Sequence, residues 1–258
     1  MLTNWLKRHQ SSIGYSRPNE DVPPEKRPRL YPTTLEDLPD ELQLKIFSHL
    51  CIKDLVRCVQ VSKRTRRICL DESIWEKINL CKKNVHADLL RFILDNGCKY
   101  LDLGCSKIKG DLKLSGKNYE VKYLNLAECT ANIDVFRELI TSCQSLQKLS
   151  LRGLESNTNP GMKINVIPIL LNNLNHQFLK VLDIQKLDGL NLRYVKNILK
   201  SEKLTEISFR YTPNLSRLPY LVDYIVHNLP ENIQKISLGG ISIPGSLKDA
   251  HIKARLYK

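Results

Sequence analysis

The chain has 258 residues, enough for one small domain and one larger one. Its hydrophobic fraction of 42% and charged fraction of 26% are those of an ordinary folded protein, which excludes a mainly disordered chain. The formal net charge of +13 allows attraction to nucleic acid, acidic lipid or an acidic protein, or simply solvated lysines. Residues 1–10 lack the apolar run of a signal peptide, and eight scattered cysteines without a Cys-x-x-Cys pair predict reduced thiols. We therefore expect an intracellular protein.

Residues 1–33 are rich in proline and charge and have no sustained apolar period, so they are predicted to be a disordered basic arm. This arm contains the cluster Lys26, Arg27 and Arg29, which is of the kind that import receptors recognise. Short basic runs also arise by chance in a lysine-rich chain. The cluster predicts a location in the nucleus as well as the cytoplasm.

Residues 34–76 are expected to form three short helices. A proline and two acidic residues after Leu38 indicate a helix start, and apolar residues then recur at helical intervals. So small a bundle cannot bury all of its apolar side chains, so a partner is expected to cover the remainder. The residues expected at that contact are Leu38, Pro39, Leu42, Ile46, Phe47, Leu50, Leu55, Val61 and Trp75.

Residues 77–245 carry about six or seven repeats of a short apolar-x-apolar signature. The first apolar residues of successive signatures lie between 23 and 33 residues apart, close to the spacing of leucine-rich repeats. This spacing predicts an α/β solenoid with a curved parallel sheet on its concave side and helices on its convex side. A short tail, residues 246–258, would follow. The signatures are Ile78/Leu80, Leu101/Leu103, Leu124/Leu126, Leu149/Leu151, Leu182/Ile184, Ile207/Phe209 and Ile236/Leu238.

Side chains beside the apolar anchors are predicted to face away from the core, because successive side chains of a strand point to opposite faces. A solenoid exposes a long surface of this kind, so it favours binding over catalysis. Lys148, Arg152, Arg210 and Lys235 could pair there with a phosphate on a target. The residues predicted to bind a target are Tyr100, Asp102, Tyr123, Asn125, Lys148, Ser150, Arg152, Asp183, Glu206, Arg210 and Lys235.

Helices are expected between the strands. Asp88, Asp134 and Asn191 each precede an apolar helical pattern and are predicted to cap it. Regularity fails after Leu151, where residues 155–161 are dense in turn formers and predict an exposed loop. That loop is either a tolerated insertion or a segment that helps to select a ligand.

Signatures of catalysis are missing from the sequence. It has no glycine-rich phosphate loop and no zinc spacing, and its six histidines are isolated from one another. We therefore expect no metal, no cofactor and no enzymatic activity of the chain itself.

The helical segment resembles an F-box. Its similarity to that family rests on Leu38-Pro39, Glu41-Leu42, Ile46-Phe47, the run from Val61 to Arg64, and Trp75. With the repeats, the chain resembles the F-box/leucine-rich repeat family, and residues 35–154 are most similar to its S-phase kinase-associated branch, which recruits phosphorylated cell-cycle inhibitors. The departure is Thr65-Arg66, where many F-boxes carry a tryptophan.

This resemblance implies a substrate receptor of an SCF-type ubiquitin ligase. Such a receptor binds a Skp-type adaptor through the F-box and, through that adaptor, the cullin and RING subunits. It holds a protein target, often a phosphorylated one, on the repeats for proteasomal degradation. The alternative is a basic interaction scaffold for nucleic acid, in which the helical segment only caps the repeats. The sequence lacks the aromatic interleaving of a single-strand binder, which disfavours that alternative.

Overall fold

Contacts divide the chain into two units, one ending at Ile74 and one beginning at Trp75. The computed structural model describes residues 34–114, 116–156, 166–175, 177–187, 189–212, 217 and 219–239. The predicted arm 1–33, its basic cluster Lys26, Arg27 and Arg29, the tail 246–258 and most of the predicted loop at 155–161 lie outside these residues, so they stay predictions.

The first unit is helical, as its periodicity indicates. Thr34 and Asp37 form a capping box that starts the first turn, and Pro39 stands at the cap of the second helix. Ser62 caps the fourth element by accepting a hydrogen bond from the backbone N–H of Thr65. The elements are η1 (Leu35–Asp37), α2 (Asp40–Phe47), α3 (Ile52–Cys58), α4 (Lys63–Cys69) and α5 (Glu72–Trp75).

Helix α4 packs against both α2 and α3, so the core of the helical unit lies between these three helices. Phe47 of α2, Leu55 of α3 and Ile68 of α4 are each at most 5% exposed. Burial of apolar surface on this scale is the main stabilising term of such a bundle.

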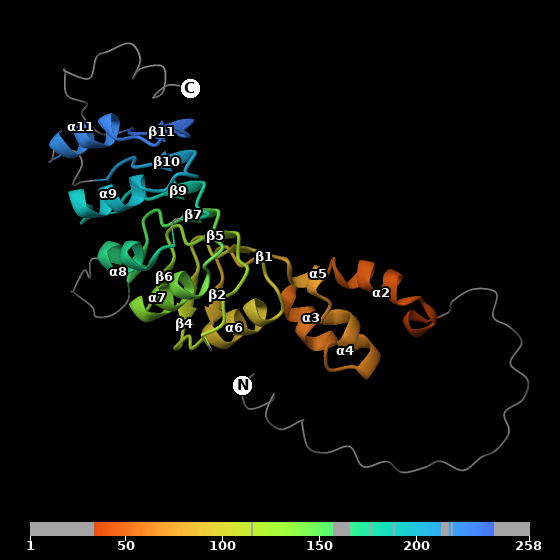
Figure 1. Ribbon diagram of the computed structural model, residues 1–258. Coiled ribbons are helices and arrows are strands. Elements are labelled where there is room, and N and C mark those ends of the chain that lie inside the picture. Colours follow the sequence, from red (N-terminus) through yellow and green to blue (C-terminus); the bar gives the residue numbers. More distant parts are fainter. Residues whose placement is uncertain are drawn as a thin grey trace, which may run out of the picture. The chain divides into compact units, whose positions relative to one another are not determined.

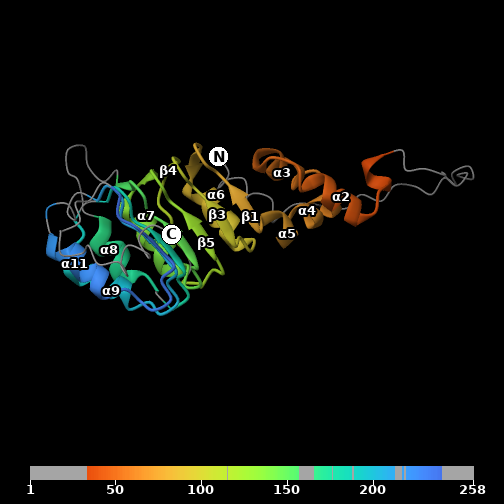
Figure 2. The same cartoon turned by 90° about the horizontal axis from the view of Figure 1, so that it is seen from above.

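The second unit is built on a parallel sheet of seven strands within the described residues, in the order β1-β3-β5-β7-β9-β10-β11. Each strand therefore pairs with the next one of its kind along the chain. Figures 1 and 2 show the helices of this unit gathered on one side of the sheet. The strands are β1 (Lys77–Asn79), β3 (Tyr100–Asp102), β5 (Tyr123–Asn125), β7 (Lys148–Ser150), β9 (Val181–Asp183), β10 (Glu206–Ser208) and β11 (Lys235–Ser237).

The registers align the first apolar anchors of all seven signatures across the sheet. Both anchors of every signature are less than 9% exposed, and they face the helices. The predicted α/β class is thus confirmed, with a parallel sheet and intervening helices. Those helices are α6 (Ala87–Asp95), α7 (Ile133–Ser142), α8 (Val166–Asn173), α9 (Leu192–Leu199) and α11 (Pro219–His227).

The chain also forms a second parallel sheet, which the sequence did not indicate, from short strands that follow the first four strands of the larger sheet. Its order is β2-β4-β6-β8, and each of its strands follows one strand of the larger sheet. Each strand has only two or three residues, and Val85 and Ile108 are the buried centres of the first two. The strands are β2 (Asn84–His86), β4 (Lys107–Lys109), β6 (Thr130–Ala131) and β8 (Glu155–Ser156).

A left-handed residue stands two positions after the second anchor of six signatures, with φ between 54° and 59°. This conformation turns the chain out of the sheet, and it costs a non-glycine residue about 1–2 kcal/mol. The backbone N–H of each donates to a carbonyl of the following repeat at 2.6–3.0 Å, which offsets the cost. These residues are Lys82, Cys105, Glu128, Gly153, Lys186 and Tyr211.

Two of the predicted helix caps are wrong and one is confirmed. His86 caps α6 and Asn132 caps α7, in each case by accepting from the N–H of the aspartate two residues later. Asp88 and Asp134 lie instead in the first turn, where a negative charge favours the positive end of the helix dipole. Asn191 caps α9 as predicted. No described helix is long and apolar enough to cross a membrane.

Candidate functional site

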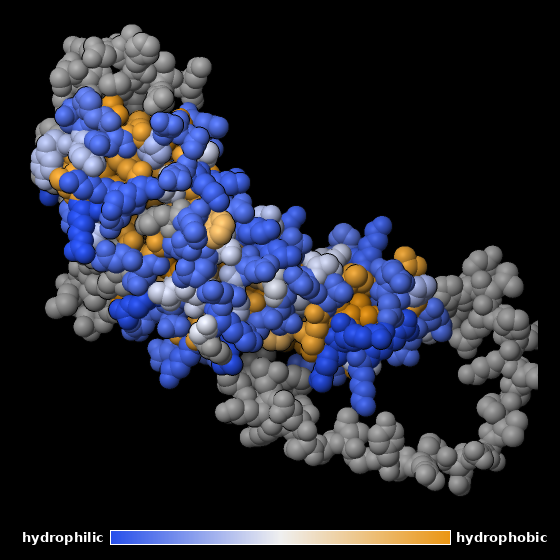
Figure 3. Space-filling view, in the orientation of Figure 1, coloured by the Kyte–Doolittle hydropathy of each residue, from blue (hydrophilic) through white to orange (hydrophobic). Residues whose placement is uncertain are grey.

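The helical unit exposes a set of large apolar side chains. Leu35, Leu42, Ile46 and Val61 are 45%, 48%, 43% and 71% exposed. Pro39 is also exposed, while Leu38 and Leu50 are half-buried. Figure 3 shows hydrophobic surface on this unit among hydrophilic side chains. Several large apolar side chains exposed on so small a unit are a typical feature of a protein-binding surface.

Three residues that the sequence placed at this contact are instead in the interior. Phe47 and Leu55 are 2% exposed, and Trp75 is fully buried, with its ring 5.1 Å from that of Phe92 in an edge-to-face arrangement. We assign these three side chains to the core, because a covered side chain has little surface left for a partner. Helical spacing predicts an apolar stripe, but it does not say which side of the stripe the chain itself covers.

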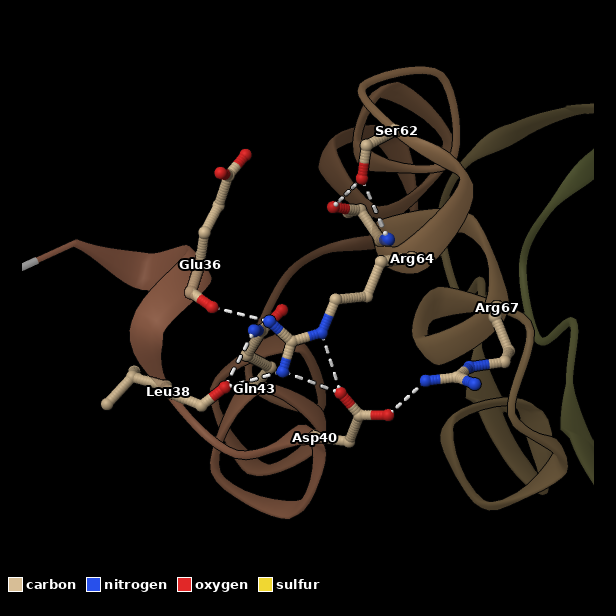
Figure 4. Close-up of polar contacts among 8 residues, drawn as sticks. Glu36, Leu38, Asp40, Gln43, Ser62, Arg64 and Arg67 are labelled. Atoms are coloured by element: carbon tan, nitrogen blue, oxygen red, sulfur yellow. Dashed lines mark hydrogen bonds and ion pairs between the residues drawn. The ribbon is translucent and has the colours of Figure 1, made fainter. Parts of the chain in front are cut away.

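Arg64 of α4 holds the segment that carries Leu38 and Pro39, as Figure 4 shows. Its Nε donates to Asp40 Oδ1 at 2.8 Å, its Nη2 donates to the Leu38 carbonyl at 2.7 Å, and its Nη1 donates to the carbonyl of Glu36. Gln43, a buried polar residue, donates a further hydrogen bond to the Leu38 carbonyl at 3.0 Å. A planar guanidinium with several donors suits this multiple contact. Arg64 is therefore a positioning residue for Leu38 and Pro39.

Asp40 joins two arginines. Its second carboxylate oxygen pairs with Arg67, which lies one helical turn after Arg64 on α4. The hydrogen bond from Arg64, with added attraction from Arg67, keeps the pKa of Asp40 below its usual value. The sequence pointed to the Val61–Arg64 run only through resemblance, since contacts across 24 residues give no local signal.

The strands of the large sheet present their polar side chains on the face away from the helices, which we call the strand face. Its first row consists of the residues that begin each strand, and the register places Tyr100 beside Tyr123. Lys77 lies 5.4 Å from the centre of the Tyr100 ring, a cation–π distance. At the far end of this row Lys235 Nζ lies 3.8 Å from Glu206 Oε2. The first row thus combines two tyrosines with lysines on either side.

The middle row consists of the residues that end each strand, between its two apolar anchors, and it is more structural than the sequence indicated. Asp102, Asn125 and Asp183 each accept, through a side-chain oxygen, a hydrogen bond from the backbone N–H two residues later, at 2.9–3.2 Å. Asn125 also donates to Asp102 at 2.8 Å, and Ser150 donates to Asp183 at 3.1 Å. These side chains satisfy turn N–H groups that leave the sheet. They lie on the predicted face, but part of their hydrogen-bonding capacity is already used.

The four cations that the sequence predicted as partners of a phosphate occupy two kinds of position. Lys148 and Lys235 begin their strands, whereas Arg152 and Arg210 follow the ends of β7 and β10. Arg152 is joined by two residues that the sequence reasoning missed. Its Nη2 lies 3.7 Å from Glu128 Oε1, and Lys186 Nζ lies 3.5 Å from the same oxygen. We call Arg152, Lys186 and Glu128 the rim cluster.

A cysteine and a glycine complete the surroundings of the rim cluster. The Cys105 thiol donates to Glu128 Oε2 at 3.6 Å, and this contact, followed by the charges of Arg152 and Lys186, lowers the pKa of Glu128. Glu128 and Lys186 meet across Gly153, where a Cβ would lie 3.2 Å from Glu128 Cγ. Counting two residues past each second anchor would have found both charged residues.

No three histidine, cysteine or acidic side chains come together as metal ligands among the residues that the structure describes. The eight cysteines, all of them described, form no disulfide bond. Burial raises the pKa of Cys98 and Cys143 to about 12, so their sulfurs stay protonated near neutral pH.

Comparison with known proteins identifies the helical part of the chain. Residues 35–81 match the family described as F-box-like. These residues are an F-box-like domain. Over 53 residues, 20% of this chain, the sequence is 43% identical to the ubiquitin ligase complex F-box protein UFO1 of Saccharomyces cerevisiae. That stretch covers 8% of UFO1, so the similarity does not extend to the rest of that protein.

Proposed function

We propose that this chain is the non-catalytic substrate receptor of an SCF-type E3 ubiquitin ligase. Its F-box-like domain would dock on a Skp-type adaptor and thereby reach the cullin and RING subunits. The observation that carries this proposal is the exposed apolar set Leu42, Ile46 and Val61 within that domain. A groove on a helical partner would cover such side chains, which water otherwise solvates at a cost.

Positioning of Leu38 and Pro39 supports the same docking role. The Arg64 and Gln43 hydrogen bonds fix the Leu38 carbonyl, so the following proline projects from a held backbone. A contact residue that is fixed before binding loses less conformational entropy when the complex forms. We propose Leu38, Pro39, Leu42, Ile46 and Val61 as the adaptor contact, with Leu50 at its margin.

We propose further that residues 77–245 are a leucine-rich repeat solenoid and that the strand face is its concave, target-binding side. The aligned anchors, the chain-order strands and the recurring left-handed turns support this. Nothing in this arrangement requires the chain to perform chemistry, because a receptor only holds its target near the ubiquitin-transferring subunits.

The proposed target is a phosphorylated protein linked to the cell cycle, marked for proteasomal degradation. Support comes from cations at the rim of the strand face, among them Arg152 and Arg210, and from the resemblance of the first repeats to the S-phase kinase-associated branch. We also propose a nuclear and cytoplasmic location, which rests on the Lys26, Arg27 and Arg29 cluster.

A double substitution tests the docking proposal. The full chain with Leu38→Ala and Pro39→Ala should lose purified Skp-type adaptor and cullin in a pull-down, while the wild type retains both. Leu112→Ala, which removes a buried side chain from the second unit, is the control for general destabilisation and should leave adaptor capture intact. Equal capture by wild type and the double variant would refute the proposed contact.

The alternative, a nucleic-acid scaffold, predicts binding to DNA or RNA that survives the same double substitution and falls with salt. The strand face opposes it, because Asp102, Asp183 and Glu206 place carboxylates along the track that a phosphate backbone would follow.

A further inference from the structure

The rim cluster differs from the structural arginine contact in the helical unit. Arg64 donates hydrogen bonds to three oxygens of its own chain. Arg152, in contrast, has a buried Nε without any hydrogen-bond partner in the described part of the chain, and its ion pair with Glu128 spans 3.7 Å. A guanidinium has five N–H donors, and one of them here is buried without an acceptor, which is costly. The guanidinium of Arg152 is therefore not saturated with hydrogen bonds by the described residues.

Glu128 is held loosely by both of its cations. The 3.5 Å and 3.7 Å separations are longer than the 2.7–2.9 Å typical of charge-assisted hydrogen bonds. One carboxylate oxygen is shared between two cations, while the other receives a weak thiol hydrogen bond at 3.6 Å. A single-charged carboxylate thus bridges two positive groups without satisfying either.

The rim cluster lies at the edge of the strand face, the surface that is proposed to bind the target. Arg152 follows β7 and Lys186 follows β9, neighbouring strands in the sheet, so the two residues stand at one edge of the strand face. Arg210, one repeat further on, is exposed, with its guanidinium 5.7 Å from the ring centre of Tyr211. Positive charge therefore continues from the rim cluster toward β10, where a protein segment bound at the cluster could also contact Arg210.

We infer that Arg152 and Lys186 form a phosphoryl-binding site on the proposed target-binding face, and that Glu128 fills this site in the unbound chain as a tethered competitor. This inference rests on the proposed function. A target carboxylate would compete poorly, because Glu128 offers the same chemistry at a high effective concentration. A phosphoryl group, with a charge near −2 and three acceptor oxygens, can satisfy both cations and displace Glu128. Glu128 thereby selects phosphorylated over merely acidic segments.

A single phosphoryl group fits this site better than a nucleic-acid strand does. The site has two cations and one carboxylate, and the middle row beside it carries Asp183. A strand of regularly spaced phosphates would meet that carboxylate, whereas one modified side chain on a protein segment would not. The ligand is therefore a phosphorylated protein side chain.

The test is an NMR titration of the full chain with inorganic phosphate and with blocked phosphothreonine, following the arginine Nε–Hε signals. We expect one arginine signal to shift saturably and to disappear in Arg152→Gln. Glu128→Gln should tighten binding of either probe about tenfold, the value of one charged hydrogen bond, and should also admit blocked glutamate. Arg137→Gln removes a positive charge paired with Asp134 on α7 and serves as the matched control, with binding unchanged.

Three outcomes would overturn the inference. The first is the absence of saturable binding in both the wild type and Glu128→Gln, and the second is binding that Arg152→Gln does not weaken. The third is a single-stranded oligonucleotide that binds at Arg152 more tightly than blocked phosphothreonine does. Adaptor binding, measured on the same variants, should stay at the wild-type level. Loss of phosphate binding with adaptor binding intact would therefore count against this site alone, and not against the docking proposal.

Discussion

Two neighbouring residues of α2 separate docking from folding. Ile46 is 43% exposed and Phe47 is 2% exposed, although both were expected at the adaptor contact. Phe47→Ala leaves a cavity between α2 and its neighbours, and such a change costs about 3–5 kcal/mol. The helical unit is small, so this loss should unfold much of it. Ile46→Ala removes surface from an exposed site, where changes usually stay within about 0.5 kcal/mol.

The binding effect of Ile46→Ala follows from its exposed part. Full burial of an isoleucine side chain is worth about 2 kcal/mol, so covering the exposed 43% should contribute about 1 kcal/mol. That is about a fivefold change in Kd, and a cavity left in the partner raises it to about tenfold.

Calorimetric titration with purified adaptor and thermal unfolding of the same samples measure both quantities. We expect Ile46→Ala to keep the wild-type Tm and to bind at least fivefold more weakly. Phe47→Ala should lower the Tm of the helical unit. Wild-type affinity of Ile46→Ala, together with an unchanged Tm for Phe47→Ala, would refute the division of α2 into an inner and an outer side.

Three further predictions concern pH, the strand face and the thiols. The folded pKa of Asp40 is lowered from 3.8, so the stability from its arginine contacts is complete above about pH 5 and is lost as pH falls through the folded pKa. The stability that Asp40 contributes should therefore be level from pH 8 to about pH 5 and fall below about pH 4, and an acid-side loss of stability that is the same in Asp40→Asn as in the wild type would contradict this. Asn125→Ala leaves the buried Ala127 N–H without its acceptor and should lower the free energy of unfolding in urea by about 1–3 kcal/mol, whereas Ser237→Ala on the same row should change it little. At pH 8 a maleimide should label the exposed Cys51 rapidly and the buried Cys143 only after denaturation, which peptide mass spectrometry can follow; equal rates would contradict the burial of Cys143.

The repeat frame was the most predictable part of the fold. Each strand of the large sheet has one buried anchor flanked by less buried residues, most of them polar, so the sequence marks it directly, and Ile78, Leu101 and Leu124 align in the sheet. The second sheet was not predictable in this way. A strand such as Thr130–Ala131 has two residues, too few for any alternation, and it forms only because the repeats before and after it bring its neighbours into register.

Helix caps were predicted to within two residues. At His86-Ala87-Asp88 the aspartate is the more typical capping residue, and at Asn132-Ile133-Asp134 both polar residues are equally typical. The cap is nevertheless defined by the backbone that precedes the first turn, and that backbone is set by the strand before it. Residue type alone could not choose between two polar residues so close together.

The candidate site was predictable in its positions but not in its contacts. Alternation placed Asp102 and Asn125 on the outer face correctly, yet their bonds to N–H groups two residues on depend on the left-handed turns that follow. Arg64 and Asp40 lie 24 residues apart, and Glu128 and Lys186 lie 58 apart. Pairs of this kind form only when packing or repeat stacking brings distant segments together.

The measurement that tests the central claim most directly is the mass of the complex formed by the full chain, a Skp-type adaptor and a cullin amino-terminal domain, determined by light scattering during gel filtration. The account predicts a stable ternary complex with one copy of each, which Ile46→Ala weakens and Arg152→Gln leaves intact. A chain that elutes separately from the adaptor at micromolar concentrations would contradict the account.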